Sequence, residues 1–454
     1  MGRIFGTDGV RGIANKDLSI DLAMDIGRAA AMVVEESIGK QPLFLVGMDT
    51  RLSGDMLESA IAAGLCSAGA NVKLLGIIPT PAVAYLVKLY GADAGIMLSA
   101  SHNPYEYNGI KIFNSQGYKL LDVQEDEIEG IVLDHVKPYS IKAPGELGRI
   151  SYAPDAAADY VRYLVSTAGC DLSGMRIAVD CANGSASITA PLLFRQLGVN
   201  ADIFYASHDG ENINAHCGST HIDTISRIVK ESHYELGLAF DGDADRLLAV
   251  DEKGELVDGD RLMAMFACHL KKQGKLKENT LVATVMSNLG LFKFGEAQDI
   301  EIRAAKVGDR YVLEQMRTEG FTLGGEQSGH IIFLDYMTTG DGELSAVQLL
   351  TLLRESGQTL SQAAGKMQVY PQVLVNLSAT AEMKAMLEEP EVKEEIIARS
   401  SPLEGNGRVL VRPSGTEPLI RVMVEGPDIT VTEAVAQDIA QWLKTIKEPC
   451  GVGV

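Results

Sequence analysis

The sequence predicts an α/β protein with three similar mixed-sheet α/β domains and a smaller C-terminal α+β domain around a central cleft. Three observations lead to this prediction. Strand-like and helix-like segments alternate along most of the chain, as in sheets with helices on both faces. The same order of segments recurs three times before the pattern changes near Tyr370. Moreover, a chain of 454 residues is too long for one compact core.

Each repeat begins with a short apolar strand, of the kind that is buried in parallel sheets. These first strands are expected at residues 43–48, 176–180 and 280–285. After helical segments, second strands are expected near 72–75, 201–205 and 300–304, and third strands at 94–98, 236–240 and 321–323. A fourth strand (109–113, 247–250, 331–334) and an amphipathic helix (126–135, 261–272, 343–355) close each repeat.

The third strand of every repeat is followed by a loop that is rich in chemically active side chains. These loops are Ser99–Pro104 (SASHNP), Asp241–Arg246 (DGDADR) and Gly324–His330 (GGEQSGH). Ligands of open α/β sheets bind beyond the carboxyl ends of the strands. We therefore expect the three domains to turn one loop each toward a common cleft.

Beyond residue 370 the pattern changes to that of a small α+β domain. Strands are expected at 373–377, 408–412 and 419–425, with helical segments at 381–399 and 430–446. The predicted domains are 1–150 with the serine loop, 151–255 with the aspartate loop, 256–368 with the third loop, and 369–454.

Composition and charge exclude several classes of function. The chain has 40 basic and 61 acidic residues and a formal charge of −21, which disfavours nucleic acid and anionic membranes as partners. No apolar run approaches the roughly 20 residues that cross a bilayer, and the N-terminus lacks an apolar signal core. Six scattered cysteines without a Cys-x-x-Cys pair indicate buried thiols in a reducing cytoplasm, so we expect a cytoplasmic protein without zinc.

The aspartate loop predicts a cation site. Asp241, Asp243 and Asp245 alternate with small residues, so their side chains point to one side of an extended chain, and a turn at Gly242 can gather them. Carboxylate ligands favour magnesium or calcium over zinc, and the twelve-residue EF-hand pattern is missing. Magnesium held by few carboxylates completes its shell with water and phosphate oxygens.

The other loops offer groups for a phosphorylated sugar. Ser101, with an exposed hydroxyl in a turn, is a reasonable phosphoryl acceptor, although alone it is more typical of a turn serine. The third loop has polar groups that suit sugar hydroxyls, but the same segment could be an ordinary polar turn. His330 could equally be a histidine of the protein core. Guanidinium, hydroxyl and backbone N–H groups suit an oxyanion, and they occur together at Arg412, Ser414, Gly415, Thr416 and Arg421. The alternative is a tight hairpin with surface arginines. No nucleotide-binding glycine motif is present in the sequence.

Six segments occur in an order that resembles the α-D-phosphohexomutase superfamily, and most closely its phosphoglucosamine mutase branch. They are Phe5–Gly12 (FGTDGVRG), Ser99–Pro104 (SASHNP), Asn108–Lys111 (NGIK), Asp241–Arg246 (DGDADR), Gly325–His330 (GEQSGH) and Arg412–Glu417 (RPSGTE). Gln327 favours glucosamine phosphate, because phosphomannomutases tend to carry methionine there.

The resemblance implies an isomerase of amino-sugar metabolism. Glucosamine 6-phosphate and glucosamine 1-phosphate would interconvert through phosphoserine 101 and glucosamine 1,6-bisphosphate, feeding UDP-N-acetylglucosamine and cell-wall precursor synthesis. One Mg²⁺ per chain would be bound by Asp241, Asp243, Asp245 and the phosphate on Ser101. The family also makes a homodimer an option, although no surface patch in the sequence identifies one.

The resemblance also implies roles for the remaining residues. Glu326 and Ser328 would bind the sugar hydroxyls, and the residues of the oxyanion site would bind the phosphate that does not react. Arg11, Lys111 and His330 would assist with charge stabilisation and proton transfer, and Arg246 would add positive charge near the transferring group.

Three alternatives remain open. A phosphomannomutase or phosphoglucomutase would use the same groups on another sugar. An aspartyl-phosphate sugar phosphatase would use Asp241 as nucleophile and would not need Ser101. An inactive sugar-phosphate sensor is disfavoured, because binding alone does not need the serine, three aspartates and the arginines together.

Overall fold

The structure is a computed structural model that describes residues 3–6, 8–414 and 418–445. The chain divides into two compact units. The first contains the residues up to Met286 together with Ile300–Lys366, and the second contains Ser287–Asp299 together with the residues from Met367 onward.

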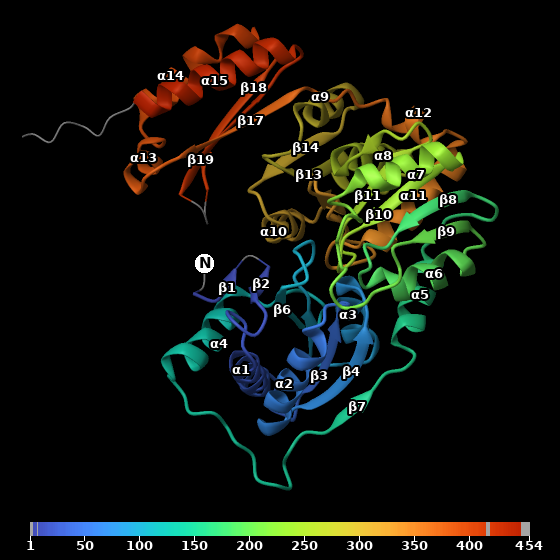
Figure 1. Cartoon of the computed structure of the whole chain (residues 1–454), viewed down its shortest axis with the longest axis vertical. Coiled ribbons are helices and arrows are strands. Elements are labelled where there is room, and N and C mark those ends of the chain that lie inside the picture. The colour runs from blue at the N-terminus through green and yellow to red at the C-terminus, as the bar shows by residue number, and fades with distance from the viewer. Residues whose placement is uncertain (1–2, 7, 415–417, 446–454) are drawn as a thin grey trace, which may run out of the picture. The chain divides into compact units, whose positions relative to one another are not determined.

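The first unit contains three mixed sheets (Figure 1). The first sheet has seven strands in the order β1-β2-β6-β5-β3-β4-β7. Its strands are β1 (Phe5–Gly6), β2 (Gly9–Ile13), β3 (Leu43–Met48), β4 (Asn71–Ile77), β5 (Ala94–Leu98), β6 (Tyr107–Asn114) and β7 (Ile150–Tyr152). The helices of this part are α1 (Ile20–Ile38), α2 (Gly54–Ser67), α3 (Thr80–Leu89) and α4 (Asp122–Asp134).

The second sheet has five strands in the order β12-β11-β10-β8-β9. They are β8 (Arg176–Asp180), β9 (Asn200–Phe204), β10 (Leu236–Phe240), β11 (Leu247–Asp251) and β12 (Leu256–Val257), with helices α5 (Ala156–Ser166), α6 (Ala186–Gln196) and α7 (Ile222–Ser232).

The third sheet has four strands in the order β14-β13-β15-β16. They are β13 (Thr280–Thr284), β14 (Glu301–Ala305), β15 (Leu323–Gly325) and β16 (Ile331–Phe333). The helices here are α8 (Gly259–Lys272), α10 (Asp309–Glu319), α11 (Gly342–Ser356) and α12 (Leu360–Ala364), with a 3₁₀ turn at Lys277–Asn279.

The three sheets share one pairing scheme. The first strand of each repeat pairs in parallel with the second and the third. The third strand pairs antiparallel with the fourth. Each predicted loop therefore connects an antiparallel pair at the carboxyl end of the third strand, where open α/β sheets bind ligands.

The second unit has a three-stranded antiparallel sheet in the order β17-β19-β18. Its elements are α9 (Leu289–Gln298), β17 (Gln372–Ser378), α13 (Ala381–Met386), α14 (Pro390–Arg399), a 3₁₀ turn at Ser401–Leu403, β18 (Arg408–Pro413), β19 (Leu419–Glu425) and α15 (Ile429–Thr445). The fold class of three α/β domains and a smaller C-terminal domain is thus confirmed.

The expectation that each repeat is closed by its own following helix is wrong for the second and third repeats. Helix α8 packs on β13 and β15 of the third sheet, and α11 packs on β10 and β11 of the second. Most of α11 is buried, including the consecutive residues Leu344–Val347. A helix that is buried on most sides needs neighbours on several faces, and α11 also contacts α5 and α8.

Two predicted segments differ in detail. The third strand of the third repeat starts at Leu323 rather than at Phe321, because the Phe321 N–H, two residues beyond the end of α10, donates to Met316 O of that helix at 2.8 Å. The predicted helix 381–399 is two helices that separate at Pro390. The preceding residue, Glu389, is extended (φ −67°, ψ 134°), as the proline ring favours.

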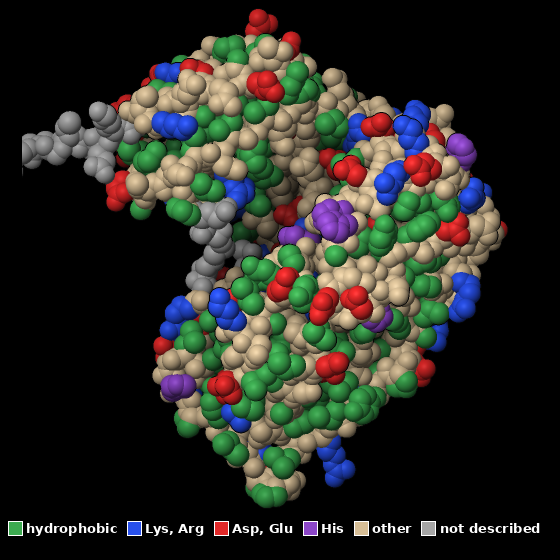
Figure 2. All heavy atoms as spheres, viewed as in Figure 1, with side chains coloured by type: hydrophobic (Ala, Val, Ile, Leu, Met, Phe, Trp, Pro, Cys, Tyr) green, Lys and Arg blue, Asp and Glu red, His purple; other side chains and the backbone are tan. Residues whose placement is uncertain are grey.

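The surface and the cysteines agree with the composition. On the face in Figure 2, acidic and basic side chains are interspersed rather than gathered into one large patch of either sign. The five cysteines within the described residues are free thiols, but the expectation that they are buried is right only for Cys181 and Cys217, since the other three are partly exposed. Cys450 lies outside the described residues. Within the described part of the chain, every helix is too short or too polar to cross a membrane.

Glu343 at the start of α11 should destabilise the protein at alkaline pH. It is fully buried, and neither carboxyl oxygen has a hydrogen-bond partner among the described residues. Burial and the neighbouring Asp341 raise its pKa well above the usual value. Above the unfolded-state pKa of about 4.3, only the unfolded chain ionises fully, so stability falls as pH rises.

We therefore expect Glu343→Gln to raise the apparent melting temperature by about 2 °C or more at pH 8, and by less at pH 5. The control is Glu296→Gln, because that side chain is 72% exposed. Equal effects of Glu343→Gln at both pH values would contradict a neutral buried carboxyl.

Candidate active site

The loops of the three sheets meet within the first unit. Ser101 Oγ donates to Asp241 Oδ2 at 2.5 Å, which joins the first loop to the second. His330 Nδ1 lies 3.5 Å from Asp245 Oδ2, which joins the third loop to the second. Lys111 of β6 donates to Asp243 Oδ2 at 2.7 Å. The structure thus brings the serine, the aspartates and the histidine into one cluster.

The three aspartates form a buried group that could hold a metal ion. One carboxylate oxygen from each of Asp241, Asp243 and Asp245 lies within 4.8 Å of the others. Asp243 Oδ1 and Asp245 Oδ1 are buried and have no hydrogen-bond donor among the described residues. Unsatisfied buried carboxylate oxygens are costly unless a cation binds them. This donor set fits a hard divalent cation.

The turn that gathers the aspartates differs from the expected one. Ala244, not Gly242, has the left-handed conformation, with φ 56°. Gly242 is needed for close approach instead, because a Cβ atom there would lie 2.6 Å from Ser101 O and 2.9 Å from Asn214 Nδ2. The glycine therefore lets the aspartate loop contact the serine loop directly.

Ser101 is not exposed, contrary to the expectation from its turn. The residue is 1% exposed and has a left-handed backbone with φ 53°. Its hydroxyl also lies 3.4 Å from His102 Nδ1. Burial, together with Arg246 and Arg11, lowers the pKa of His102 to about 4, so this ring is neutral at physiological pH. The contact with Asp241 is the shorter one, so Asp241 is the main partner of the hydroxyl.

Lys111 is a buried ammonium among carboxylates. It is 1% exposed and lies 3.3 Å from Asp8 and 3.6 Å from Asp245, in addition to its bond with Asp243. Burial alone would lower its pKa, but Asp243, Asp8 and Asp245 raise it above the ordinary lysine value. Burial likewise opposes ionisation of Asp245, yet Lys111 and His330 hold its pKa well below the usual range. Both groups are therefore charged at neutral pH.

The two predicted arginines add positive charge at the same cluster. Arg246 Nε lies 3.7 Å from Asp245 Oδ1, and Arg11 forms an ion pair with Asp8. The buried Nε atoms of both arginines lack a hydrogen-bond acceptor among the described residues. Each can thus donate to an incoming anion.

His330 is subject to two opposing influences. Burial lowers its pKa, but Asp245 and Asp309 outweigh burial and raise the pKa to about 9. The Gly340 N–H, however, donates to Nε2 at 3.1 Å, which requires this nitrogen to be unprotonated. In the neutral form of the ring the proton therefore lies on Nδ1, facing Asp245, and protonation of Nε2, which the raised pKa favours at neutral pH, breaks the bond from Gly340.

The sugar-binding candidates lie on the β15–β16 connection. Glu326 Oε1 accepts the N–H of Gly308 at 3.1 Å. Ser328 Oγ is buried without a partner among the described residues. Gln327 has a structural contact instead, because its Nε2 donates to Asp258, the N-cap residue of α8, at 3.1 Å.

Sequence reasoning missed three charged residues of the cluster. Lys119 forms ion pairs with Asp8 and with Asp309, the latter at 2.6 Å. Asp309 also lies 3.7 Å from His330 Nε2. Asp8 belongs to the FGTDGVRG segment and could have been singled out there. Lys119 and Asp309 are 190 residues apart and follow no motif, so only the fold shows that they pair.

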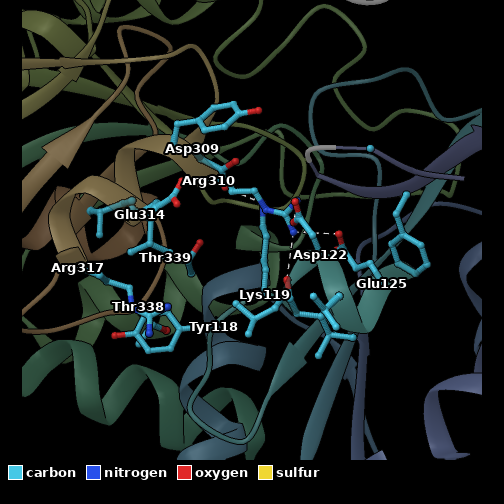
Figure 3. A pocket seen from close by; sticks show the side chains of 18 of the residues that line it. Tyr118, Lys119, Asp122, Glu125, Asp309, Arg310, Glu314, Arg317, Thr338 and Thr339 are labelled. Carbon is cyan, nitrogen blue, oxygen red and sulfur yellow. Dashed lines mark hydrogen bonds and ion pairs between the residues drawn. The ribbon is translucent and has the colours of Figure 1, made fainter. Parts of the chain in front are cut away.

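A cavity of about 780 Å³ adjoins this charged cluster, between elements of the first and third sheets. Figure 3 shows Lys119 and Asp309 at its wall, and Arg310 of α10 extending toward Asp122 and Glu125 of α4. The Arg317 guanidinium lies 4.1 Å from the centre of the Tyr118 ring. The lining is of mixed charge and selects no anion or cation by itself.

The predicted oxyanion site lies in the second unit. Arg412 of β18 and Arg421 of β19 are cross-strand partners. Burial and the nearby Arg421 lower the pKa of Arg412. A bound anion would relieve this repulsion. Ser414 closes β18, with its N–H bonded to Leu419 O at 2.8 Å, whereas Gly415 and Thr416 lie outside the described residues.

Comparisons with known proteins match the whole architecture. Four phosphoglucomutase/phosphomannomutase domain families match the chain. They are α/β/α domain I over residues 2–137, α/β/α domain II over 158–254, α/β/α domain III over 258–370 and the C-terminal domain over 374–441.

Relatives of nearly the same length share about half of their residues with this chain. The phosphoglucosamine mutase of Acetivibrio thermocellus is 52% identical over 99% of this chain and 100% of the relative. That of a Thermoanaerobacter species is 53% identical over 98% of this chain and 99% of the relative.

Solved structures share the fold at lower identity. A phosphoglucomutase/phosphomannomutase family protein from Burkholderia thailandensis has a TM-score of 0.81 at 24% identity, over 98% of both chains. The Aspergillus fumigatus N-acetylphosphoglucosamine mutase, solved with GlcNAc-6P and magnesium, has a TM-score of 0.68 at 17% identity, over 96% of this chain and 94% of that one. The chain belongs to the phosphoglucomutase/phosphomannomutase family and, within this phosphohexomutase superfamily, to the phosphoglucosamine mutases.

Proposed function

We propose that the protein interconverts glucosamine 6-phosphate and glucosamine 1-phosphate through a phosphoserine at Ser101. The product would feed UDP-N-acetylglucosamine synthesis. The observation that supports this proposal most directly is the 2.5 Å contact between Ser101 Oγ and Asp241 Oδ2, because a phosphoryl group on Ser101 would then lie beside the aspartates that could hold a cation. Relatives that are named phosphoglucosamine mutase and match over their full length support the choice of sugar.

The reaction would consist of two phosphoryl transfers in opposite directions. First, the bond between phosphorus and Ser101 Oγ breaks while the free hydroxyl of the monophosphate attacks, loses its proton and gains the phosphoryl group. The resulting glucosamine 1,6-bisphosphate reorients in the site, so that its other phosphoryl group faces Ser101. Its other phosphoryl group then returns to Ser101, and the sugar hydroxyl that leaves regains a proton.

A magnesium ion fits the aspartate loop. Asp241, Asp243 and Asp245 would hold it together with a phosphate oxygen on Ser101, one ion per chain. When bound, it would supply positive charge that stabilises the phosphoryl group during transfer. The two carboxylate oxygens that lack donors, on Asp243 and Asp245, support this assignment.

The basic side chains around the loop would neutralise the rest of the developing charge. Lys111, Arg11 and Arg246 already lie among the carboxylates at short distances, so little reorganisation is needed when a phosphate enters. His330 would assist in proton transfer. Glu326 and Ser328 would bind sugar hydroxyls and orient the ring for each half-reaction.

The C-terminal domain would bind the phosphate that does not react. Arg412, Ser414, Gly415, Thr416 and Arg421 offer guanidinium, hydroxyl and amide donors for this purpose. We place the four domains at 1–150, 151–255, 256–368 and 369–454, so that each contributes one loop. Both orientations of the bisphosphate must fit, so these groups would recognise phosphate rather than one face of the sugar.

Loss of the serine hydroxyl should abolish the reaction. With magnesium and phosphorylated protein, we expect isomerisation of glucosamine 6-phosphate to exceed that of glucose and mannose phosphates, and Ser101→Ala to lower kcat by about 1,000-fold or more. A preference for another hexose phosphate would contradict the choice of sugar. Release of inorganic phosphate by a fully active Ser101→Ala variant would instead indicate the aspartyl-phosphate phosphatase.

Loss of one loop carboxylate should weaken cation binding. We expect Asp245→Asn to lower the affinity for Mn²⁺, used as a spectroscopic substitute for magnesium, by about 10-fold or more in electron paramagnetic resonance titrations. The matched control is Asp202→Asn, since Asp202 only accepts a hydrogen bond from Tyr234 at 2.6 Å. Equal Mn²⁺ affinities of Asp245→Asn and wild type would refute the site.

Loss of one arginine of the proposed oxyanion site should weaken substrate binding. A charge-assisted hydrogen bond contributes about 1.5–3 kcal/mol, so Arg412→Gln should raise KM for both glucosamine monophosphates by about 10- to 100-fold. The control is Arg399→Gln, whose guanidinium instead pairs with Asp438 at 2.7 Å. An unchanged KM in steady-state assays of Arg412→Gln would count against phosphate binding there.

A further inference from the structure

A buried ion pair lies beside the serine loop and has no part in the mechanism above. Asp49 and Arg51 directly follow β3, and their side chains are 0% exposed. Arg51 Nε donates to Asp49 Oδ2 at 2.9 Å. A buried ion pair of this kind adds little net stability, because removing both charges from water offsets their attraction. Stability alone therefore does not explain why Asp49 and Arg51 are buried together.

The guanidinium group of Arg51 binds the backbone of the serine loop. Nη2 donates to the carbonyl oxygens of Ser101 and Asn103, at 2.9 and 2.8 Å. Nη1 donates to those of Pro104 and Tyr107, the latter at 3.0 Å. With the bond from Nε to Asp49, all five guanidinium N–H groups have acceptors. A lysine at this position offers three donors and cannot replace this arrangement.

The carbonyl oxygens of Ser101 and Asn103 have a second donor. Asn214, which lies between β9 and α7, donates from Nδ2 to Ser101 O at 2.9 Å and to Asn103 O at 3.1 Å. On the other side, Ser99 Oγ donates to Asp49 Oδ2 at 2.6 Å and accepts the N–H of Ser101 at 2.9 Å. Both backbone polar groups of Ser101 are therefore fixed by side chains.

This fixation matters because Ser101 has an unfavourable backbone conformation. Its φ is 53°, in the left-handed region that residues other than glycine seldom adopt. Such a conformation is unfavourable for a residue with a side chain and persists only where the surroundings enforce it. In this conformation the hydroxyl reaches Asp241 at 2.5 Å.

We propose that Arg51, anchored by Asp49, is a positioning residue for phosphoryl transfer, because it holds the Ser101 loop in the conformation that presents Oγ to the aspartate loop. This inference rests on the proposed role of Ser101 as phosphoryl carrier. The hydrogen bonds of the Arg51 guanidinium go to Asp49 and to backbone carbonyl oxygens between Ser101 and Tyr107, so Arg51 acts through the serine loop. Its loss should therefore affect kcat far more than KM.

The test is Arg51→Lys in the full-length protein with magnesium, which keeps the charge but loses two donors. A misplacement of about 1 Å in a reacting group can cost about 100-fold in rate. We expect kcat for glucosamine 6-phosphate to fall by about that factor, with KM changed by less than about threefold. The ³¹P resonance of the phosphoserine should broaden or split in the variant, because the loop then samples several conformations. The control is Arg162→Lys, whose side chain is 73% exposed.

A second variant covers the case in which Arg51→Lys does not fold. Asn214→Asp keeps the shape but places a carboxylate oxygen in the position of the donor, so we expect kcat to fall by about 10-fold at nearly unchanged KM. Wild-type kcat and a single sharp ³¹P resonance in whichever variant folds would overturn the inference. Parallel measurements on Ser101→Ala separate the two proposals. An active Ser101→Ala, or a wild-type protein that never carries phosphate, overturns the function itself, whereas an inert Ser101→Ala with a fully active Arg51→Lys overturns only the positioning role.

Discussion

Oppositely charged side chains are buried together around the three aspartates, and the rest of the site depends on their pairing. A buried ion costs several kcal/mol unless partners with good geometry surround it. Lys111 satisfies this condition through Asp243, Asp8 and Asp245, at 2.7 to 3.6 Å. Its partners come from two different sheets, so the charges are paired only when the sheets are correctly assembled. Folding of the first unit and assembly of this charged cluster are therefore the same event.

The repeated sheet topology explains how one scaffold presents three loops with different side chains. In each repeat the loop joins the antiparallel third and fourth strands, whose register fixes where the loop begins and ends. A rigid frame of this kind tolerates any loop sequence that satisfies its own backbone. The serine loop does so through the side chains of Arg51 and Asn214, and the aspartate loop through Gly242 and Ala244.

Much of this arrangement could be predicted from the sequence, because it is encoded in local patterns. The strands at Leu43–Met48, Ala94–Leu98 and Leu236–Phe240 were predicted with their observed bounds from uninterrupted apolar runs. The exchange of α8 and α11 between sheets could not be predicted, since amphipathicity shows that a helix face is buried but not which sheet covers it. The Lys119–Asp309 pair and the burial of Ser101 likewise depend on contacts between segments that are distant in sequence.

In the proposed reaction, Ser101 carries the phosphoryl group that the sugar receives. The most direct measurement is a single turnover of protein labelled with ³²P at Ser101, mixed with unlabelled glucosamine 6-phosphate. We predict that the label moves to the sugar within one turnover, first in glucosamine 1,6-bisphosphate and then in both monophosphates. Label that stays on the protein while the sugar isomerises, or that appears as inorganic phosphate, would contradict the account.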